Sequence, residues 1–150
     1  MHEKNTEELV EELKISPKIE HFIKKNQDEF KIPLYQYINK LLEERHLSKS
    51  DLVEKINPDD KHIYHILSGL RNPSRKKLLT IARALELNLD ETNYLLRYGG
   101  FGILYVRDIW DAIIIRAIEK NLTILETNHI LEQLNLPLLN ANPKDSANND

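Results

Sequence analysis

Helix-starting signals recur along this chain and limit its fold more than any other feature of the sequence. At four expected helix starts an Asn, Ser or Thr stands three residues before an Asp or Glu, which is the spacing of an N-terminal capping box. The four pairs are Asn5 with Glu8, Ser48 with Asp51, Asn88 with Glu91, and Thr123 with Glu126. No segment shows a sustained two-residue alternation of apolar and polar side chains. The sequence therefore predicts an all-α protein.

Proline and asparagine predict further helix boundaries. Ser16 followed by Pro17 predicts the start of a short second helix, and Pro33 predicts the start of a third. A stop is expected at Asn57 and Pro58, because Asn tolerates left-handed geometry and Pro disfavours helical geometry in the residue before it.

The segment after this stop, DKHIYHILSG, predicts a short helix. Asp59 or Asp60 is expected to cap it, and Gly69 is expected to end it after Leu67. Its apolar positions recur at offsets of three, four and seven, which predicts one buried face formed by Ile63, Ile66, Leu67 and Leu70.

These boundaries predict a domain organisation for the 150 residues. Residues 1–32 are expected to form an N-terminal helical extension, and residues 33–98 a domain of five helices. Residues 99–139 are expected to form a C-terminal helix hairpin packed on that domain. The polar residues 140–150 predict a disordered tail.

The sequence also contains an internal similarity. Residues 78–96 align without a gap to residues 113–131, including Ala82 with Ala117 and the triplets that begin at Glu91 and Glu126. Two copies are too few to establish a repeat array. The alternatives are two helix hairpins with the same capping chemistry, or a true duplication.

Composition narrows the function without assigning it. The chain has 41% hydrophobic residues, no cysteine and a net charge of −3, which excludes disulfide scaffolds, thiol nucleophiles and a wholly basic nucleic-acid protein. The first 30 residues lack the apolar run of a secretory signal, and no segment is apolar enough to span a membrane. We expect a cytoplasmic protein. Only residues 33–98 are net positive, with 11 Lys+Arg against 9 Asp+Glu.

A more specific pattern lies in residues 48–74. Its elements are Ser48 and Lys49, the pair Leu52-Val53, Asn57, Ile63, then Gly69 and Pro73-Ser74, followed later by the segment from Leu78 to Leu85. This pattern resembles, without a gap, the helix-turn-helix domain of the Xre/Cro and phage-repressor family. The resemblance implies a five-helix repressor-like fold and a transcriptional regulator whose partner is double-stranded DNA. It covers about half of the chain.

The resemblance also implies roles for individual residues. The helix that begins at Ser48 would cross the DNA backbone, and the helix from Asp60 to Ser68 would enter the major groove. Lys49 stands where the family has a Gln. Asp60, Lys61 and His65 stand at positions that often touch base edges, and Arg71 and Asn72 lie in a loop that often meets phosphate. The basic run at Arg75 adds further candidates. The predicted DNA-binding residues are Lys49, Asp60, Lys61, His62, Tyr64, His65, Arg71, Asn72, Arg75 and Lys76.

The two carboxylates at the start of the predicted recognition helix oppose DNA binding. A carboxylate a few Å from a phosphate is repelled by about 1 kcal/mol in water, so Asp59 and Asp60 are expected to weaken sequence-independent binding. Asp60 could accept a hydrogen bond from cytosine, but its position predicts a helix cap first.

Metal binding, phosphate binding by a glycine-rich loop and catalysis have weaker support in the sequence. His62 and His65 have the spacing of a partial metal site but lack a second cluster of ligands. The GGFG segment at residues 99–102 lacks the strand and the lysine of a phosphate-binding loop. No nucleophile, base and orienting group form a catalytic set. We therefore expect no enzyme activity, no cofactor and no bound metal.

The remaining alternative is a protein-interaction module that keeps the helix-turn-helix fold without reading DNA. The overall acidic charge and the apolar segment RDIWDAIIIRAIEK support it. The apolar residues of that segment exceed what one helix face buries, which predicts a homodimer through the C-terminal helices. The operator, target genes, sign of regulation and effector cannot be read from the sequence.

Overall fold

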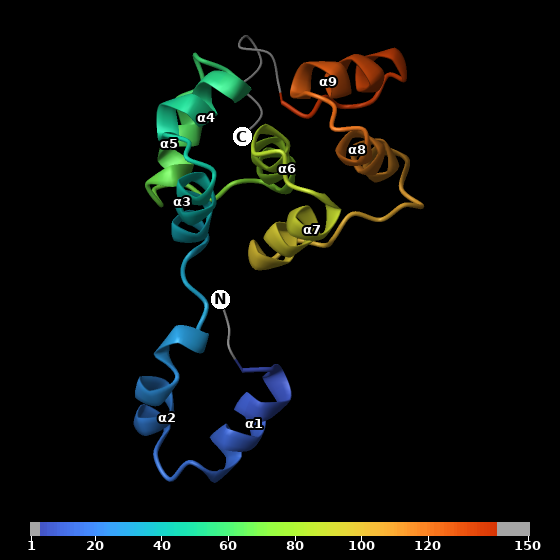
Figure 1. Cartoon of the computed structure of the whole chain (residues 1–150). Coiled ribbons are helices and arrows are strands. Elements are labelled where there is room, and N and C mark those ends of the chain that lie inside the picture. Colours follow the sequence, from blue (N-terminus) through green and yellow to red (C-terminus); the bar gives the residue numbers. More distant parts are fainter. Residues whose placement is uncertain (1–3, 141–150) are drawn as a thin grey trace. The chain divides into compact units, whose positions relative to one another are not determined.

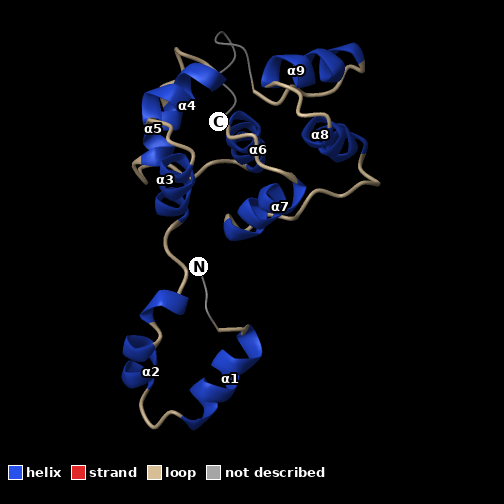
Figure 2. Cartoon of the chain, in the orientation of Figure 1, coloured by secondary structure: helices blue, strands red, loops and turns tan. Residues whose placement is uncertain are grey.

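The computed structural model describes residues 4–140 of the chain (Figure 1). Within these residues the chain forms nine α-helices, one short 3-10 turn and no strand (Figure 2), which confirms the predicted all-α class. Contacts divide the chain into two compact units, Met1–Pro33 and Leu34–Asp150. Nothing in the part of the chain described here is long and apolar enough to serve as a membrane-spanning helix.

The N-terminal unit contains α1 (Thr6–Ile15), α2 (Ile19–Lys25) and a 3-10 turn (Gln27–Glu29). Asn5 caps α1 as predicted, by accepting the backbone N–H of Glu8 at 2.8 Å. The prediction that Ser16 starts α2 is wrong. Ser16 ends α1, because its hydroxyl donates to the Glu12 carbonyl at 2.9 Å, and α2 begins only after Lys18.

Glu12 joins the elements of this unit. Its carboxylate lies 2.9 Å from the ammonium groups of both Lys4 and Lys25, and it accepts a 3.3 Å hydrogen bond from Asn26. Hydrogen bonds from Lys25, Lys4 and Asn26 lower the pKa of Glu12 to about 2. Phe22 is the buried hydrophobic residue of α2, and its ring meets that of Phe30 edge to face.

The described residues of the main unit, 34–140, form seven helices. They are α3 (Leu34–Glu44), α4 (Lys49–Ile56), α5 (His62–Leu67), α6 (Arg75–Ala84), α7 (Leu89–Tyr98), α8 (Ile109–Glu119) and α9 (Ile124–Gln133). Helix α6 is central and contacts α4, α7 and α9 (Figure 1). All residues from Leu78 to Ala84 are buried, because neighbours cover this helix on every side. The core of the unit is a single apolar cluster around it.

The same turn geometry joins α3 to α4, α6 to α7 and α8 to α9. In each, a residue with positive φ is followed by a leucine whose N–H donates to a carbonyl five residues earlier, and then by the capping residue of the next helix. The positive-φ residues are His46 (55°), Glu86 (56°) and Asn121 (49°). The caps that follow are the predicted capping boxes of Ser48, Asn88 and Thr123. In each box both hydrogen bonds form: the cap side chain accepts the N–H three residues on, and the carboxylate of that residue accepts the N–H of the cap. Local capping chemistry thus sets these boundaries.

The internal similarity extends beyond the aligned helices. Asn93 of α7 accepts the backbone N–H of Leu104 at 2.9 Å, and Asn128 of α9 accepts that of Leu139 at 2.7 Å. Both pairs span 11 residues, and both leucines are buried. The α6–α7 and α8–α9 hairpins therefore share one architecture, including the segment that returns after the second helix.

The end of the described chain is held by this second hairpin. The side chain of Asn140 accepts a hydrogen bond from Asn128 at 2.6 Å and donates to the Ile56 carbonyl at 3.3 Å. Asn140 is thus anchored, although it was expected to begin a disordered tail. The rest of that predicted tail, residues 141–150, lies outside the described residues.

Two local expectations around α5 are wrong. Asn57 has φ −169°, so α4 ends in extended backbone before Pro58 and not in a left-handed turn. Leu70 is 70% exposed and does not share the buried face of Ile63, Ile66 and Leu67. The reason is that Gly69 turns the chain with φ +83° directly after α5, which ends the helical register.

Gly69 is required by both conformation and space. A Cβ atom there would lie 2.8 Å from the ring of Tyr35 in α3. We expect Gly69→Ala to lower the free energy of unfolding by about 1–2 kcal/mol from backbone strain alone, and by more if the ring cannot move. Gly100→Ala shares the positive φ but meets open space, and Gly102→Ala has neither constraint. Urea unfolding should rank the losses Gly69 > Gly100 > Gly102; an equal loss at Gly102 would contradict this explanation.

Candidate nucleic-acid interface

Helices α4 and α5 are joined by a tight polar turn. The Asn57 carbonyl accepts the N–H of Asp60 at 2.9 Å, and the Asn57 side chain accepts the N–H of Asp59 at 3.1 Å. At the other end of α4, hydrogen bonds from the Ser48 backbone and side chain lower the pKa of Asp51. Asp51 therefore stays ionised as the reciprocal partner of the cap. Both ends of α4 are fixed by side chains within the segment.

Helix α5 separates a buried face from an exposed one. Ile63, Ile66 and Leu67 are at most 1% exposed and fix the helix against the core. Lys61, Tyr64 and His65 are exposed, and His62 is partly exposed. The four residues predicted to read DNA from this segment therefore have at least part of their surface open to solvent, and α5 presents them on a short, well-anchored helix.

Helix α3 holds the far end of α5. Asn39 donates from its side-chain amide to the Leu67 carbonyl at 2.8 Å and to the Tyr35 carbonyl at 2.8 Å. This bond satisfies a carbonyl at the C-terminal end of α5, where no intrahelical partner exists. Asn39 was not identified in the sequence, because it is one polar residue among several on α3 and its partner lies 28 residues away.

Asp60 has a structural role. Its side chain is 8% exposed, accepts the backbone N–H of His62 at 2.9 Å, and pairs with the Lys77 ammonium at 3.0 Å. The Lys77 side chain is also largely buried, so each charge neutralises the other. Asp60 thus caps the start of α5, as predicted, and ties it to α6. We do not retain it as a base contact, since both oxygens are engaged within the protein. Asp59 is the exposed carboxylate of the pair.

Arg75 also has partners within the protein. Its guanidinium makes two hydrogen bonds to Asp111 of α8, at 3.0 and 2.9 Å, and donates to the carbonyls of Gly102 and Ile103. Arg75 therefore clamps the α7–α8 loop, and we leave it out of the proposed phosphate contacts. Lys76 beside it is exposed, as are Arg71 and Asn72 in the α5–α6 loop and Lys49 at the start of α4.

Burial and hydrogen bonding act in opposite directions on the pKa of Asp111 in the Arg75–Asp111 pair. Burial disfavours the charged form of Asp111, but hydrogen bonds from Arg75 and from the Tyr105 N–H outweigh burial and hold the pKa of Asp111 below its usual value. The carboxylate thus stays ionised although its side chain is only 7% exposed.

This lowered pKa predicts a pH-dependent contribution to stability. Because the folded-state pKa is below the unfolded value of about 3.9, the pair stabilises the protein above that pH, and the stabilisation is lost as the pH falls through the folded-state pKa. We expect Asp111→Asn to lower the free energy of unfolding by about 1–3 kcal/mol at pH 7. The difference from the unsubstituted protein should shrink below pH 4. Fluorescence of Trp110, the single tryptophan, reports unfolding of this unit; a pH-independent difference would contradict the assignment.

The histidines of α5 do not assemble with other ligands. Within residues 4–140, no three His, Asp or Glu side chains come together as a metal-binding group. The described part of the interface is therefore an array of exposed Lys, Arg, His, Tyr and Asn side chains around α5, which can donate hydrogen bonds to phosphates and base edges.

Comparison with models of protein families matches residues 38–91 to the family described as helix-turn-helix. The matched segment runs from α3 into α7 and includes α4, α5 and the loop with Arg71 and Asn72. No curated protein and no solved structure gives a match to this chain.

Proposed function

Because residues 38–91 form a helix-turn-helix domain of the Xre/Cro type, a DNA-binding family, we propose that this chain is a transcriptional regulator that recognises a short duplex site. In such domains the second helix of the pair enters the major groove and the first crosses the phosphate backbone. Here these helices are α5 and α4.

One observation carries the proposal. Tyr64 and His65 lie on the exposed face of α5 and Lys61 lies exposed directly before it, while the aliphatic residues of the helix are buried. The helix is thus held firmly with hydrogen-bonding side chains outward, which is the arrangement that base readout requires. Capping by Asp60 and the Asn39 bond fix both of its ends.

The exposed residues divide by their chemistry. Lys61 and Lys49 can donate to guanine or phosphate, and His65 can donate or accept at a base edge. Arg71 and Lys76 are proposed phosphate contacts on the α5–α6 loop and the start of α6. His62, Tyr64 and Asn72 complete the proposed interface. Asp59 is proposed to weaken sequence-independent binding by repelling phosphate.

Selection of bound duplexes from a random library tests the proposal. We expect enrichment of one short motif, followed by a steep loss of affinity with salt. If the four exposed cations each neutralise one phosphate, the slope of log K against log salt should be about −3 to −4. Failure to enrich any sequence at low salt would contradict sequence-specific recognition.

We further propose that the chain forms a homodimer, as two half-sites related by symmetry would require. Much of the apolar excess of α8 packs internally: Ile114 is buried, and Trp110 donates to the Pro137 carbonyl at 2.8 Å. Three apolar side chains in and before α8 stay largely exposed, namely Tyr105 (59%), Val106 (67%) and Ile109 (70%). Light scattering should give the mass of a dimer, and Ile109→Glu should reduce it to the mass of a monomer. A monomer mass at high protein concentration, both with and without DNA, would contradict the homodimer proposal.

A further inference from the structure

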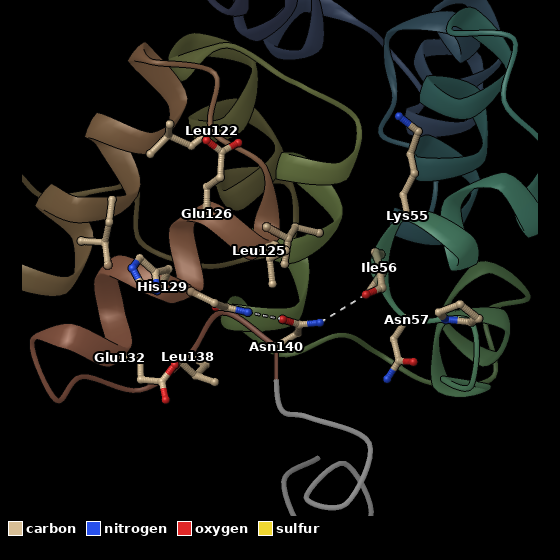
Figure 3. A pocket seen from close by; sticks show the side chains of 14 residues that line it. Lys55, Ile56, Asn57, Leu122, Leu125, Glu126, His129, Glu132, Leu138 and Asn140 are labelled. Carbon is tan, nitrogen blue, oxygen red and sulfur yellow. Dashed lines mark hydrogen bonds between the residues drawn. The ribbon is translucent and has the colours of Figure 1, made fainter.

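An open groove lies between the C-terminal end of α4 and the outer face of α9 (Figure 3). Its volume is about 930 Å³. Ile56, Leu125 and Leu138 are among its apolar lining residues, Glu126 and His129 line it from α9, and Lys55 lines it from α4. Leu125 is 80% exposed, so the groove presents a large apolar side chain that nothing in the described chain covers.

The internal similarity shows what covers part of the equivalent face in the first hairpin, although Leu125 itself corresponds to Asp90, which is exposed. A shift of 35 residues places Glu126 and His129 of α9 on Glu91 and Tyr94 of α7. Helix α3 lies against that face of α7: the ring of Tyr37 is 5.7 Å from that of Tyr94.

A charge contact accompanies this aromatic one. Glu91 accepts the N–H of its capping partner Asn88 with one oxygen and pairs with Arg45 of α3 at 3.2 Å with the other. Glu126 likewise accepts the N–H of Thr123. Within residues 4–140, however, Glu126 has no ion-pair partner. The second hairpin thus has Glu126 as the equivalent of Glu91, but within residues 4–140 it has no cation that pairs with Glu126 as Arg45 pairs with Glu91.

Burial differs between the hairpins at the same place. Leu87 and Leu95 are each 1% exposed in the first hairpin. Their equivalents, Leu122 and Ile130, both line the groove and are only partly buried. The second hairpin is therefore less covered than the first at these two positions, which lie where the groove is.

We propose that this groove docks an amphipathic helix of a partner protein, in the place that α3 takes against α7. The docked helix presents a basic side chain to Glu126 and an aromatic or aliphatic stripe to Leu125 and His129. A second copy of α9 fits less well, because it would bring another Glu126 and Glu132 against these two carboxylates. Recognition of this kind is separate from the proposed DNA contacts on α5.

The position of the groove links it to the DNA-binding segment. Asn57 and Pro58, which also line it, form the start of the turn that connects α4 to α5. A docked helix therefore touches the turn that positions α5 and the hairpin that follows the helix-turn-helix domain.

A labelled peptide copying α3, residues 33–46, is the direct probe, because α3 is the helix that fits the equivalent face. We expect fluorescence anisotropy to show binding to the full chain without DNA. Leu125→Asp should weaken this binding at least tenfold. Glu126→Gln, which keeps an oxygen for the cap, should weaken it severalfold and reduce its salt dependence. The matched control is Leu134→Asp, since Leu134 is an exposed leucine after α9 that does not line the groove.

The same peptide with Arg45→Glu should bind at least threefold more weakly if Glu126 recognises the cation. Circular dichroism of each variant shows whether its helix content is unchanged, which distinguishes the loss of the binding site from the loss of the fold. Absence of binding at millimolar peptide, or equal binding to the Leu125→Asp and Leu134→Asp variants, overturns the proposal. A Leu125-dependent dimer of the chain alone would also overturn it, because the occupant would then be a second copy. All of these measurements are made without DNA, so their outcome does not depend on whether the chain is a DNA-binding regulator.

Discussion

Replacing Arg83 with alanine should lower the free energy of unfolding of the main unit by about 3–5 kcal/mol. Arg83 lies in α6 and is 4% exposed. Its guanidinium donates to the carbonyls of Ala117 and Leu122 at 3.1 Å and of Leu87 at 3.3 Å. Leu87 and Leu122 lie in the turns that join α6 to α7 and α8 to α9, and Ala117 lies in the last part of α8. One side chain therefore holds the two equivalent hairpins together.

The size of the effect follows from what the substitution leaves behind. Alanine removes the donor to the Leu87 and Leu122 carbonyls, and each unpaired buried group costs about 1–3 kcal/mol. The Ala117 carbonyl keeps its hydrogen bond from the Leu122 N–H. Burial lowers the pKa of Arg83, but arginine remains protonated at any pH of interest, so the lost interaction is a charged one. A cavity the size of the side chain adds to the loss.

Urea unfolding followed by Trp110 fluorescence measures this loss. Arg97→Ala is the matched control, because Arg97 is an exposed arginine on the neighbouring helix α7. Arg83→Lys should recover part of the stability, since an ammonium can reach fewer of the carbonyls. Amide hydrogen exchange should show the α8–α9 hairpin opening first. A loss below about 1 kcal/mol would mean that Arg83 does not join the hairpins.

Local sequence chemistry accounts for most of the helix boundaries. Ser48, Asn88 and Thr123 cap their helices as predicted, because a capping box needs only residues three positions apart. Leu70 shows the limit of this reasoning. Its offset from Ile63 fits a helical face, but Gly69 ends the helix first, and periodicity alone does not say which signal wins.

The roles of the charged residues depended on contacts that the sequence does not show. Asp60 pairs with Lys77, 17 residues away, and Arg75 pairs with Asp111, 36 residues away. Each looked like a surface group beside the recognition helix. Their ion pairs, Asp60 with Lys77 and Arg75 with Asp111, instead make them structural, which leaves a smaller candidate set for DNA. Arg83 gave no sequence signal at all, because nothing distinguishes a buried arginine from an exposed one within a helix.

Charge reversal of Lys61 and Arg71 together should reduce affinity for a selected duplex at least a hundredfold at low salt. Each substitution removes one cation and adds one anion at a proposed DNA contact, and a loss of about 1.4 kcal/mol at each of the two positions corresponds to a hundredfold loss of affinity. Both residues are exposed, so stability should change little. Anisotropy titration of a labelled duplex measures the change.

The control has the same total charge. Arg97→Glu with Lys120→Glu changes the net charge by the same amount on α7 and at the end of α8, and we expect a change of no more than about threefold from long-range screening. If both double variants lose affinity equally, the effect is one of net charge, and the interface lies elsewhere. If neither loses affinity, α5 and its loop do not contact the duplex.

Asp59→Asn should act in the opposite direction. Removing one exposed carboxylate near the phosphates should raise affinity for random duplex severalfold, given a repulsion of about 1 kcal/mol. Asp60→Asn cannot serve this purpose, because it would also break the buried pair with Lys77 and disturb the cap of α5. In the proposed regulator, Asp59 repels the phosphates of every duplex, whatever its sequence. Favourable contacts of Lys61 and His65 with their matching bases offset this repulsion only at the selected site, so Asp59 raises the ratio of selected to random affinity. The ratio of selected to random affinity should therefore fall in Asp59→Asn, and an unchanged ratio would leave Asp59 without a role in specificity.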